Sequence, residues 1–222
     1  MFDNLQRHLG LAATGLLCLA MSGLVHAHPH GWIDLRMRLV VDDEGHLIGL
    51  HQSWRMDPFY SLVVLEELGQ AGGNDGLDAA LDQLGSEIRD NLVPYGYYTE
   101  LTLAGEKLSF DEVNDYTVLE RGGRVEFIFL LPLAEPQPLA GQTLRYQVFD
   151  PTYYIEMVHE EENRTPADDA LLVGGSLACE TRIQPADPDP EKVMQAAMLD
   201  VTDEAEPGLG RHFAETGEVT CR

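Results

Sequence analysis

The sequence predicts an α+β fold in which a mostly antiparallel β-sheet carries two or three inserted helices. Three observations support this prediction. Two alternating segments form a hairpin near the start of the chain, helical spacing is confined to three short stretches, and further strand-like segments continue to the C-terminus. The sequence has no internal repeat, low-complexity tract or clear domain boundary. We therefore expect a single domain over residues 28–222, preceded by a leader over residues 1–27.

The opening hairpin follows from alternation of apolar and polar residues over residues 32–42 and again over 47–56, on either side of a turn. One register keeps both apolar faces together. It pairs Leu39 with Leu50, Leu35 with Trp54 and Ile33 with Met56, places Ile48 on the same face, and sets Asp34 opposite Arg55 and Arg38 opposite His51.

Helices are predicted where apolar residues recur at helical spacing. Asp57 and Pro58 form a typical helix start, with an N-cap followed by proline at the first helical position, and this helix is expected to end near Leu68. A second helix is predicted over residues 76–92 and a short third one over 190–200. The remaining strands are expected at residues 97–104, 113–120, 123–131, 142–149, 153–159, 177–184 and 218–221, with a polar loop at 162–169.

The N-terminus is typical of an exported protein. Arg7 precedes an apolar run from Leu9 to Val25, and the small residue Ala27 fits a cleavage site. The run is about 17 residues long, which is too short and too rich in glycine and alanine to predict a membrane span. After it no long apolar run follows, so we expect an exported protein with no membrane span in the mature chain.

Cleavage after Ala27 would make His28 the first residue, followed by Pro29 and His30. The α-amine and imidazole of His28, together with the imidazole of His30, form a small chelating unit for zinc, copper or nickel. Pro29 has no backbone N–H, which disfavours a copper or nickel site built on successive amides. The alternative is a frayed terminus with two incidental histidines.

Carboxylates near this end are candidates to complete the site. The hairpin register brings Asp57 close to His28 and His30, although an Asp before a Pro is also a common helix cap. Asp150 lies with Tyr153 in a polar-aromatic turn that could face the same end, although Asp in such a turn often bonds its own backbone. We predict Asp57 and Asp150 as ligands, and Asp34 and Tyr153 as residues that support them.

The other histidines are weaker candidates. His51 lies roughly 26 Å along the strand from His30 at the usual strand rise, so it is left out of the site. His46 lies on a turn, His159 precedes an acidic run and could be an auxiliary ligand, and His212 near the tail could be either structural or functional.

Charge and cysteine content limit the function classes. A net charge of −24 disfavours nucleic acids and anionic membranes as partners and favours cations. The acidic stretches can equally be solvated faces. Cys18 leaves with the leader, so Cys179 and Cys221 remain as an even pair and are predicted to form a disulfide in an oxidising compartment. No GxSxG, HExxH, phosphate-loop or CxxC motif is present, so we expect no enzyme and no catalytic residues.

Four segments together resemble a known family. They are HPHGWID at residues 28–34, WRMDPFYS at 54–61, FDPTYY at 149–154, and the closing segment from Phe213 to Cys221. The chain resembles periplasmic proteins catalogued as a domain of unknown function and often described as the periplasmic component of an uncharacterised ABC-type transport system. ZevA-like members of that family act with a nickel/cobalt-type membrane permease in zinc acquisition. The resemblance implies a periplasmic accessory to transition-metal transport, most naturally of zinc.

Three functions therefore stand as hypotheses. The first is a metal-binding protein that hands zinc to an inner-membrane permease or regulates it. The second is a copper redox protein that uses His28 as a brace. The third is a docking module for a membrane transporter in which the histidines are incidental.

Overall fold

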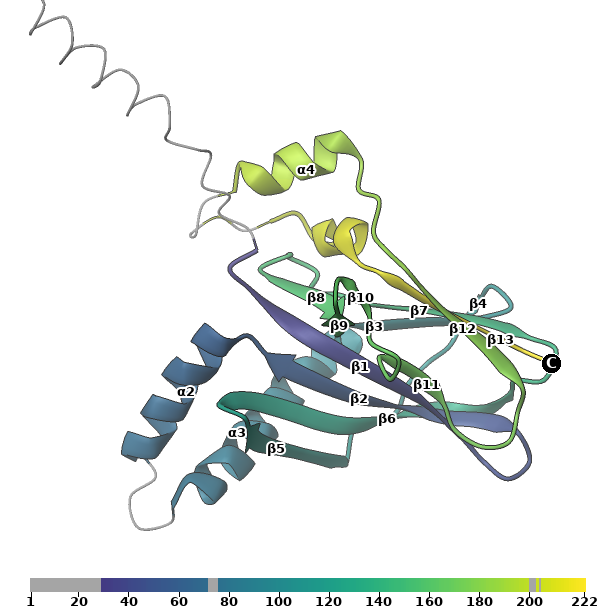
Figure 1. Ribbon diagram of the computed structural model, residues 1–222, viewed down its shortest axis with the longest axis horizontal. Helices are drawn as coiled ribbons and strands as arrows, with labels where there is room; N and C mark the ends of the chain where they lie inside the picture. The colour runs from purple at the N-terminus through teal and green to yellow at the C-terminus, as the bar shows by residue number, and fades with distance from the viewer. Residues whose placement is uncertain (1–28, 72–75, 200–202, 204) are drawn as a thin grey trace, which may run out of the picture.

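The computed structural model describes residues 29–71, 76–199, 203 and 205–222, so the predicted leader and His28 lie outside the described residues. Two β-sheets make up most of the fold, and helices gather at one end of them (Figure 1). The α+β prediction is confirmed, with strands paired mostly antiparallel.

The first sheet has the strand order β11-β1-β2-β6-β5, and β8 also pairs with β1. Its strands are β1 (Gly31–Val41), β2 (His46–Met56), β5 (Asp115–Arg121), β6 (Arg124–Pro138), β8 (Ile155–His159) and β11 (Leu171–Val173). β8 and β11 both run parallel to β1, β8 along its first half and β11 further on. β1 is therefore held on both sides, by β2 on one edge and by these two short strands on the other.

The predicted register of the first hairpin is confirmed. Leu35 pairs with Trp54, Leu39 with Leu50 and Asp34 with Arg55. The placement of Ile48 is wrong, because the register shifts after Val40 and Ile48 has no partner in β1. Leu47 is fully buried in its place. An irregularity of this kind adds one residue to one strand and so reverses the faces beyond it.

The second sheet is antiparallel throughout, with the order β12-β13-β7-β3-β4. Its strands are β3 (Thr99–Leu103), β4 (Glu106–Lys107), β7 (Thr143–Val148), β12 (Cys179–Gln184) and β13 (Thr216–Cys221). A separate small hairpin joins β9 (Glu161–Glu162) to β10 (Thr165–Pro166). One hydrophobic core joins the sheets, with Leu35 and Phe127 of the first packed with Leu101, Leu144 and Val219 of the second.

The helices follow β2 and precede β13. Helix α2 (Pro58–Ala71) and helix α3 (Gly76–Leu92) lie at the end of the first sheet beside β5 and β6 (Figure 1), and the 3₁₀ segment η1 (Val93–Tyr98) leads from α3 into β3. Helix α4 (Pro190–Ala197) and the 3₁₀ segment η2 (Leu209–Phe213) share a small second hydrophobic cluster built around Tyr153.

Several predicted boundaries need correction. Residues 97 and 98 belong to η1, because Tyr97 and Tyr98 have positive φ angles that a strand does not allow. Tyr153 also has a positive φ, so the strand predicted from residue 153 begins at Ile155. The short strand β11 was not predicted, and the predicted polar loop at 162–169 contains part of the β9–β10 hairpin.

Within the part of the chain that the structure describes, no helix is long and apolar enough to cross a membrane.

Candidate functional site

His30 lies directly before β1 and is held by the loop that precedes β8. Its backbone N–H donates to the carbonyl of Tyr154 over 2.8 Å. Its ring lies against the ring of Tyr154, with 4.5 Å between the centroids. β8 pairs with β1 from Gly31 onward, so the contact between this loop and His30 leads directly into the strand pairing.

Asp57 lies beside the start of β1, as the hairpin register predicts. Its backbone N–H donates to the carbonyl of Trp32 over 3.0 Å. Its Oδ1 accepts the N–H groups of Phe59 and Tyr60, both at 2.9 Å, so Asp57 caps helix α2. Its Oδ2 faces Gly31, where an added Cβ would lie only 2.8 Å away. The cap therefore engages one oxygen and leaves the other directed at the start of β1.

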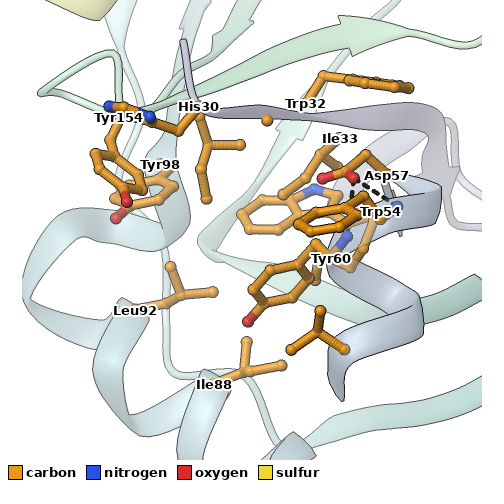
Figure 2. Close-up of a pocket in the computed structure, with 15 residues that line it drawn as sticks. His30, Trp32, Ile33, Trp54, Asp57, Tyr60, Ile88, Leu92, Tyr98 and Tyr154 are labelled. Carbon is orange, nitrogen blue, oxygen red and sulfur yellow. Dashed lines mark hydrogen bonds between the residues drawn. The ribbon is translucent and has the colours of Figure 1, made fainter. Parts of the chain in front are cut away.

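A pocket of about 390 Å³ opens beneath this point, between β1, α2, α3 and η1. Figure 2 shows Asp57, Trp54 and Tyr60 on one side of the pocket and His30, Tyr98 and Tyr154 on the other. Apolar residues of α3 close the space between them, namely Ile88 and Leu92. Burial, with a smaller contribution from the negative charge of Asp150, raises the pKa of Tyr98 to about 12. The pocket thus has aromatic walls with His30 and Asp57 on opposite sides.

Asp150 is bound entirely by its own turn. Its Oδ1 accepts the N–H and the hydroxyl of Thr152, both at 2.9 Å. Its Oδ2 accepts the N–H groups of Tyr154 and Ile155 at 3.0 and 3.1 Å. Asp150 does not line the pocket. It fixes the loop that carries Tyr154, and Tyr154 in turn holds His30.

The two predicted supporting residues have other partners. Asp34 pairs with Arg124 through its Oδ2, while Arg55, the partner expected from the register, is 3.7 Å from that oxygen. Tyr153 stacks on Phe213 with 4.0 Å between ring centroids. Burial raises the pKa of Tyr153. Neither residue lines the pocket.

His159 is buried between the sheets, where both ring nitrogens have partners. Nε2 lies 2.6 Å from the hydroxyl of Tyr146, and Nδ1 lies 2.8 Å from Oε2 of Glu215. The backbone N–H of His159 donates to the same Glu215 oxygen. A metal at His159 would have to displace one of these partners. His51 and His212 are exposed, and His46 contacts Asp42 at its turn.

Among residues 29–71, 76–199, 203 and 205–222, no group of three or more His, Cys, Asp or Glu side chains is placed to hold a metal ion. A metal site at the start of β1 therefore needs ligands from outside the described residues, of which His28 is the predicted one.

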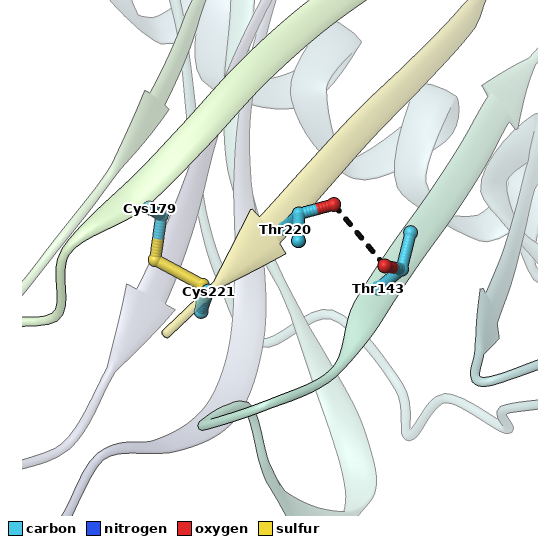
Figure 3. Close-up of a disulfide and its surroundings, with 4 residues drawn as sticks. All are labelled: Thr143, Cys179, Thr220 and Cys221. Carbon is cyan, nitrogen blue, oxygen red and sulfur yellow. Dashed lines mark hydrogen bonds between the residues drawn. A yellow bond between two sulfur atoms is a disulfide. The ribbon is translucent and has the colours of Figure 1, made fainter.

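The predicted disulfide is confirmed. Cys179 of β12 and Cys221 of β13 face each other in the strand register, and their sulfur atoms are 2.07 Å apart (Figure 3). Beside this bond, the hydroxyls of Thr143 and Thr220 lie 3.1 Å apart and link β13 to β7. The C-terminus is thereby fixed to both neighbouring strands.

The aromatic pocket itself was not predicted. Trp54 was assigned to the core, and Tyr98 to a strand. The run VPYGYY at residues 93–98 is unusually aromatic and could have signalled a special surface, but its position beside β1 depends on tertiary structure.

These features define an α+β protein in which two β-sheets and a helical end frame an aromatic pocket next to the first strand. The chain belongs to the family described as protein of unknown function (DUF1007), which it matches over residues 13–221. A relative from Haemophilus influenzae, described only as an uncharacterized protein, is 28% identical over 209 residues, which cover 93% of this chain and 97% of the relative. No solved structure matches the chain. The description of this family assigns no function, so a role of this protein in metal transport is a proposal.

Proposed function

We propose that this protein is an exported, periplasmic accessory component of a transition-metal transport system, with zinc as its cargo. The observation that carries the proposal is that His30 and Asp57 both line the pocket at the start of β1, beside the expected mature N-terminus. Imidazole and carboxylate are both common zinc ligands. The −24 net charge also favours a cationic cargo.

The hydrogen bonds made by Asp57 and Asp150 favour a ligand set that keeps Asp57 and leaves out Asp150. The proposed primary ligands are the α-amine and imidazole of His28 and the imidazole of His30, and Oδ2 of Asp57 is the carboxylate oxygen that the helix cap leaves over. Because His30 and Asp57 lie on opposite sides of the pocket, binding of one ion by both requires the side chain of His30 to turn toward Asp57. Asp150 is less suited to bind metal, because each of its oxygens already accepts two hydrogen bonds. We therefore assign Asp150 to positioning His30 through Tyr154. A site in which water occupies a position not filled by a protein ligand suits a protein that must release its metal.

Calorimetric titration tests the metal site. Zinc, copper and nickel are titrated separately into protein with its native N-terminus, confirmed by N-terminal sequencing and with any tag at the C-terminus. We expect one tight zinc site that is lost when His28→Ala and His30→Ala are combined, and that weakens below about pH 6 as imidazoles protonate. The matched control combines His51→Ala with His212→Ala, two exposed histidines elsewhere. Unchanged zinc affinity in the His28/His30 variant would refute the site.

Asp57→Asn tests the carboxylate separately. Asparagine caps helices as well as aspartate does, so the helix start is preserved while the charge is removed. The control is Asp189→Asn, which alters the N-cap of α4, where the aspartate accepts the N–H of Glu191 at 2.9 Å. Zinc affinity should fall in the first variant and not in the second. Equal affinities would remove Asp57 from the ligand set.

The proposed partner is an inner-membrane permease of the nickel/cobalt type, and α2 offers a surface for it. On this helix Phe59, which also lines the pocket, is 77% exposed, and Leu62 is 62% exposed. Exposed apolar patches commonly mark protein interaction sites. Combining Phe59→Ser with Leu62→Ser should abolish support of zinc-limited growth while zinc binding is retained. The control combines Met194→Ser with Met198→Ser on α4, where the methionines are also exposed. Full growth of the α2 variant would exclude this face.

A further inference from the structure

The pocket beneath β1 has an unusual lining for a metal site. Six aromatic side chains contribute to it, from four segments of the chain: Trp32, Trp54, Phe59, Tyr60, Tyr98 and Tyr154. The phenol oxygens of the tyrosines are only weakly acidic, and these aromatic side chains offer no imidazole or carboxylate ligand to zinc. A volume of about 390 Å³ lies in the range of small-molecule sites, roughly 300–1,000 Å³. The pocket is therefore built for an organic body and not for an ion alone.

Trp54 does not direct its polar group at the pocket. The indole N–H of Trp54 donates to Gln52 at 2.9 Å, away from the pocket lining. The planes of Trp54 and Tyr98 are within 11° of parallel, with 6.2 Å between ring centroids. Phe129 packs edge-on against Trp54 and holds it from behind. The face of an aromatic ring is its negative side, which attracts cations.

The charges around the pocket have one sign. Among the described residues that line the pocket, Asp57 is the single carboxylate and none is a lysine or an arginine. Asp57 is only 8% exposed, and its Oδ2 takes no part in the two cap bonds. An anionic ligand would thus meet repulsion, and a neutral one would leave the carboxylate without a partner.

We propose that this pocket binds a small organic cation, an amidinium or ammonium group on an apolar aromatic body, with the charge against Asp57 and the body against the aromatic wall that includes Tyr98. This activity shares Asp57 with the proposed zinc site but needs the aromatic walls and not the N-terminal histidines, so zinc and the organic cation would compete for this carboxylate.

Three probes of nearly equal shape test the charge preference: benzamidine, benzamide and benzoate, which are cationic, neutral and anionic. Both tryptophans of the chain, Trp32 and Trp54, line the pocket, so tryptophan fluorescence reports binding directly and calorimetry gives the affinity. We expect benzamidine to bind about tenfold more tightly than benzamide, as a partly buried cation–π contact and a carboxylate partner predict. Benzoate should bind weakest.

Variants connect this preference to the residues. Asp57→Asn keeps the helix cap and should reduce benzamidine to the affinity of benzamide, whereas Asp189→Asn should change nothing. Tyr98→Leu should weaken benzamidine several-fold and keeps an apolar side chain in place. Circular dichroism verifies that each variant is folded. If Asp57→Asn proves unfolded, the Tyr98 variant and the probe series still decide the question.

The outcomes separate this proposal from the zinc site. The His28→Ala variant, which leaves every described lining residue of the pocket in place, should weaken zinc binding and keep benzamidine binding. No binding of any probe, equal affinities for all three, or an unchanged preference in a folded Asp57→Asn variant would each overturn the organic-cation proposal, and none of these results would affect the assignment of zinc to the histidines.

Discussion

Asp150→Asn is the sharpest test of how the site is positioned. The Asp150 carboxylate accepts four hydrogen bonds within its own turn, at 2.9–3.1 Å. The side chain is nearly fully buried. Through Tyr154, whose carbonyl accepts the N–H of His30, this turn determines where the start of β1 lies. The substitution changes one oxygen to an NH₂ group and leaves the shape of the side chain almost unchanged.

The expected magnitude follows from the hydrogen bonds that are lost. An NH₂ group cannot accept, so whichever oxygen it replaces, two of the four donors lose their partner. Hydrogen bonds to a charged group contribute about 1.5–3 kcal/mol each. We therefore expect Asp150→Asn to reduce the free energy of unfolding by about 3–6 kcal/mol. Thr152→Val, which removes only the hydroxyl donor, should cost about 1.5–3 kcal/mol.

Urea unfolding followed by tryptophan fluorescence measures both changes, and an unchanged m-value shows that the same surface is exposed on unfolding. Calorimetry on the folded Asp150→Asn protein should show weaker zinc binding with one site retained, because His30 is less firmly held. A loss of stability below about 1 kcal/mol would refute the hydrogen-bond reasoning. Full stability with loss of the zinc site would instead make Asp150 a ligand.

Four further predictions concern the rest of the fold. Replacing Cys179 and Cys221 by serine should cost about 4 kcal/mol for a sequence separation of 42, and the loss should match that of wild-type protein unfolded in reductant. Gly210→Ala should destabilise by about 2 kcal/mol or more, because its Cβ would lie 1.9 Å from a backbone carbonyl oxygen; a neutral urea midpoint would contradict this packing. Burial raises the pKa of Glu156, so Glu156→Gln should stabilise the protein at pH 7, with the gain vanishing as the pH falls below the usual value of 4.5. At Glu160 burial raises the pKa, but two arginines lower it by more, so the pKa lies below its usual value. Glu160→Gln should therefore destabilise the protein at pH 7, and this loss of stability should shrink as the pH falls below 4.5. Parallel pH profiles of stability for the Glu156 and Glu160 variants would disprove these opposite pKa shifts.

The first hairpin could be predicted because its information is local. Alternation in two neighbouring segments and the turn between them leave one register that buries both apolar faces, and that register places Asp57 beside Gly31. Ile48 was misplaced because a bulge interrupts the alternation without altering the sequence pattern. A period of two shows which residues share a face only as far as the ladder is regular.

The neighbours of β1 on its other edge could not be predicted. β8 and β11 are five and three residues long, and each is separated from β1 by more than one hundred residues. The sequence of β8 indicates a strand, but a short strand pattern does not identify its partner or its direction.

Part of the site could be predicted because, like the first hairpin, it depends on local sequence. The position of Asp57 followed from the register, and the local alternatives for Asp57 and Asp150, a helix cap and a self-bonded turn, are both present in the structure. The pocket was missed because its aromatic residues come from segments that no sequence period connects. Tyr98 and Tyr154 lie 56 positions apart, and only the packing of η1 and the β8 loop against β1 brings them together.

The pairing of β1 sets an order for folding as the chain emerges. β1, β2, β5 and β6 all lie within residues 31–138, where β1 pairs with β2, β2 with β6 and β6 with β5, so this part of the sheet can form early. The other edge of β1 stays open until β8 and β11 have emerged, and an open strand edge invites pairing with other chains. Cys221 lies in β13 and follows Cys179 by 42 positions, so the disulfide can close only after β13 has emerged. Until then β1, the first strand to be synthesised, has an edge that can pair with other chains, and a chaperone that shields β1 would act in that interval.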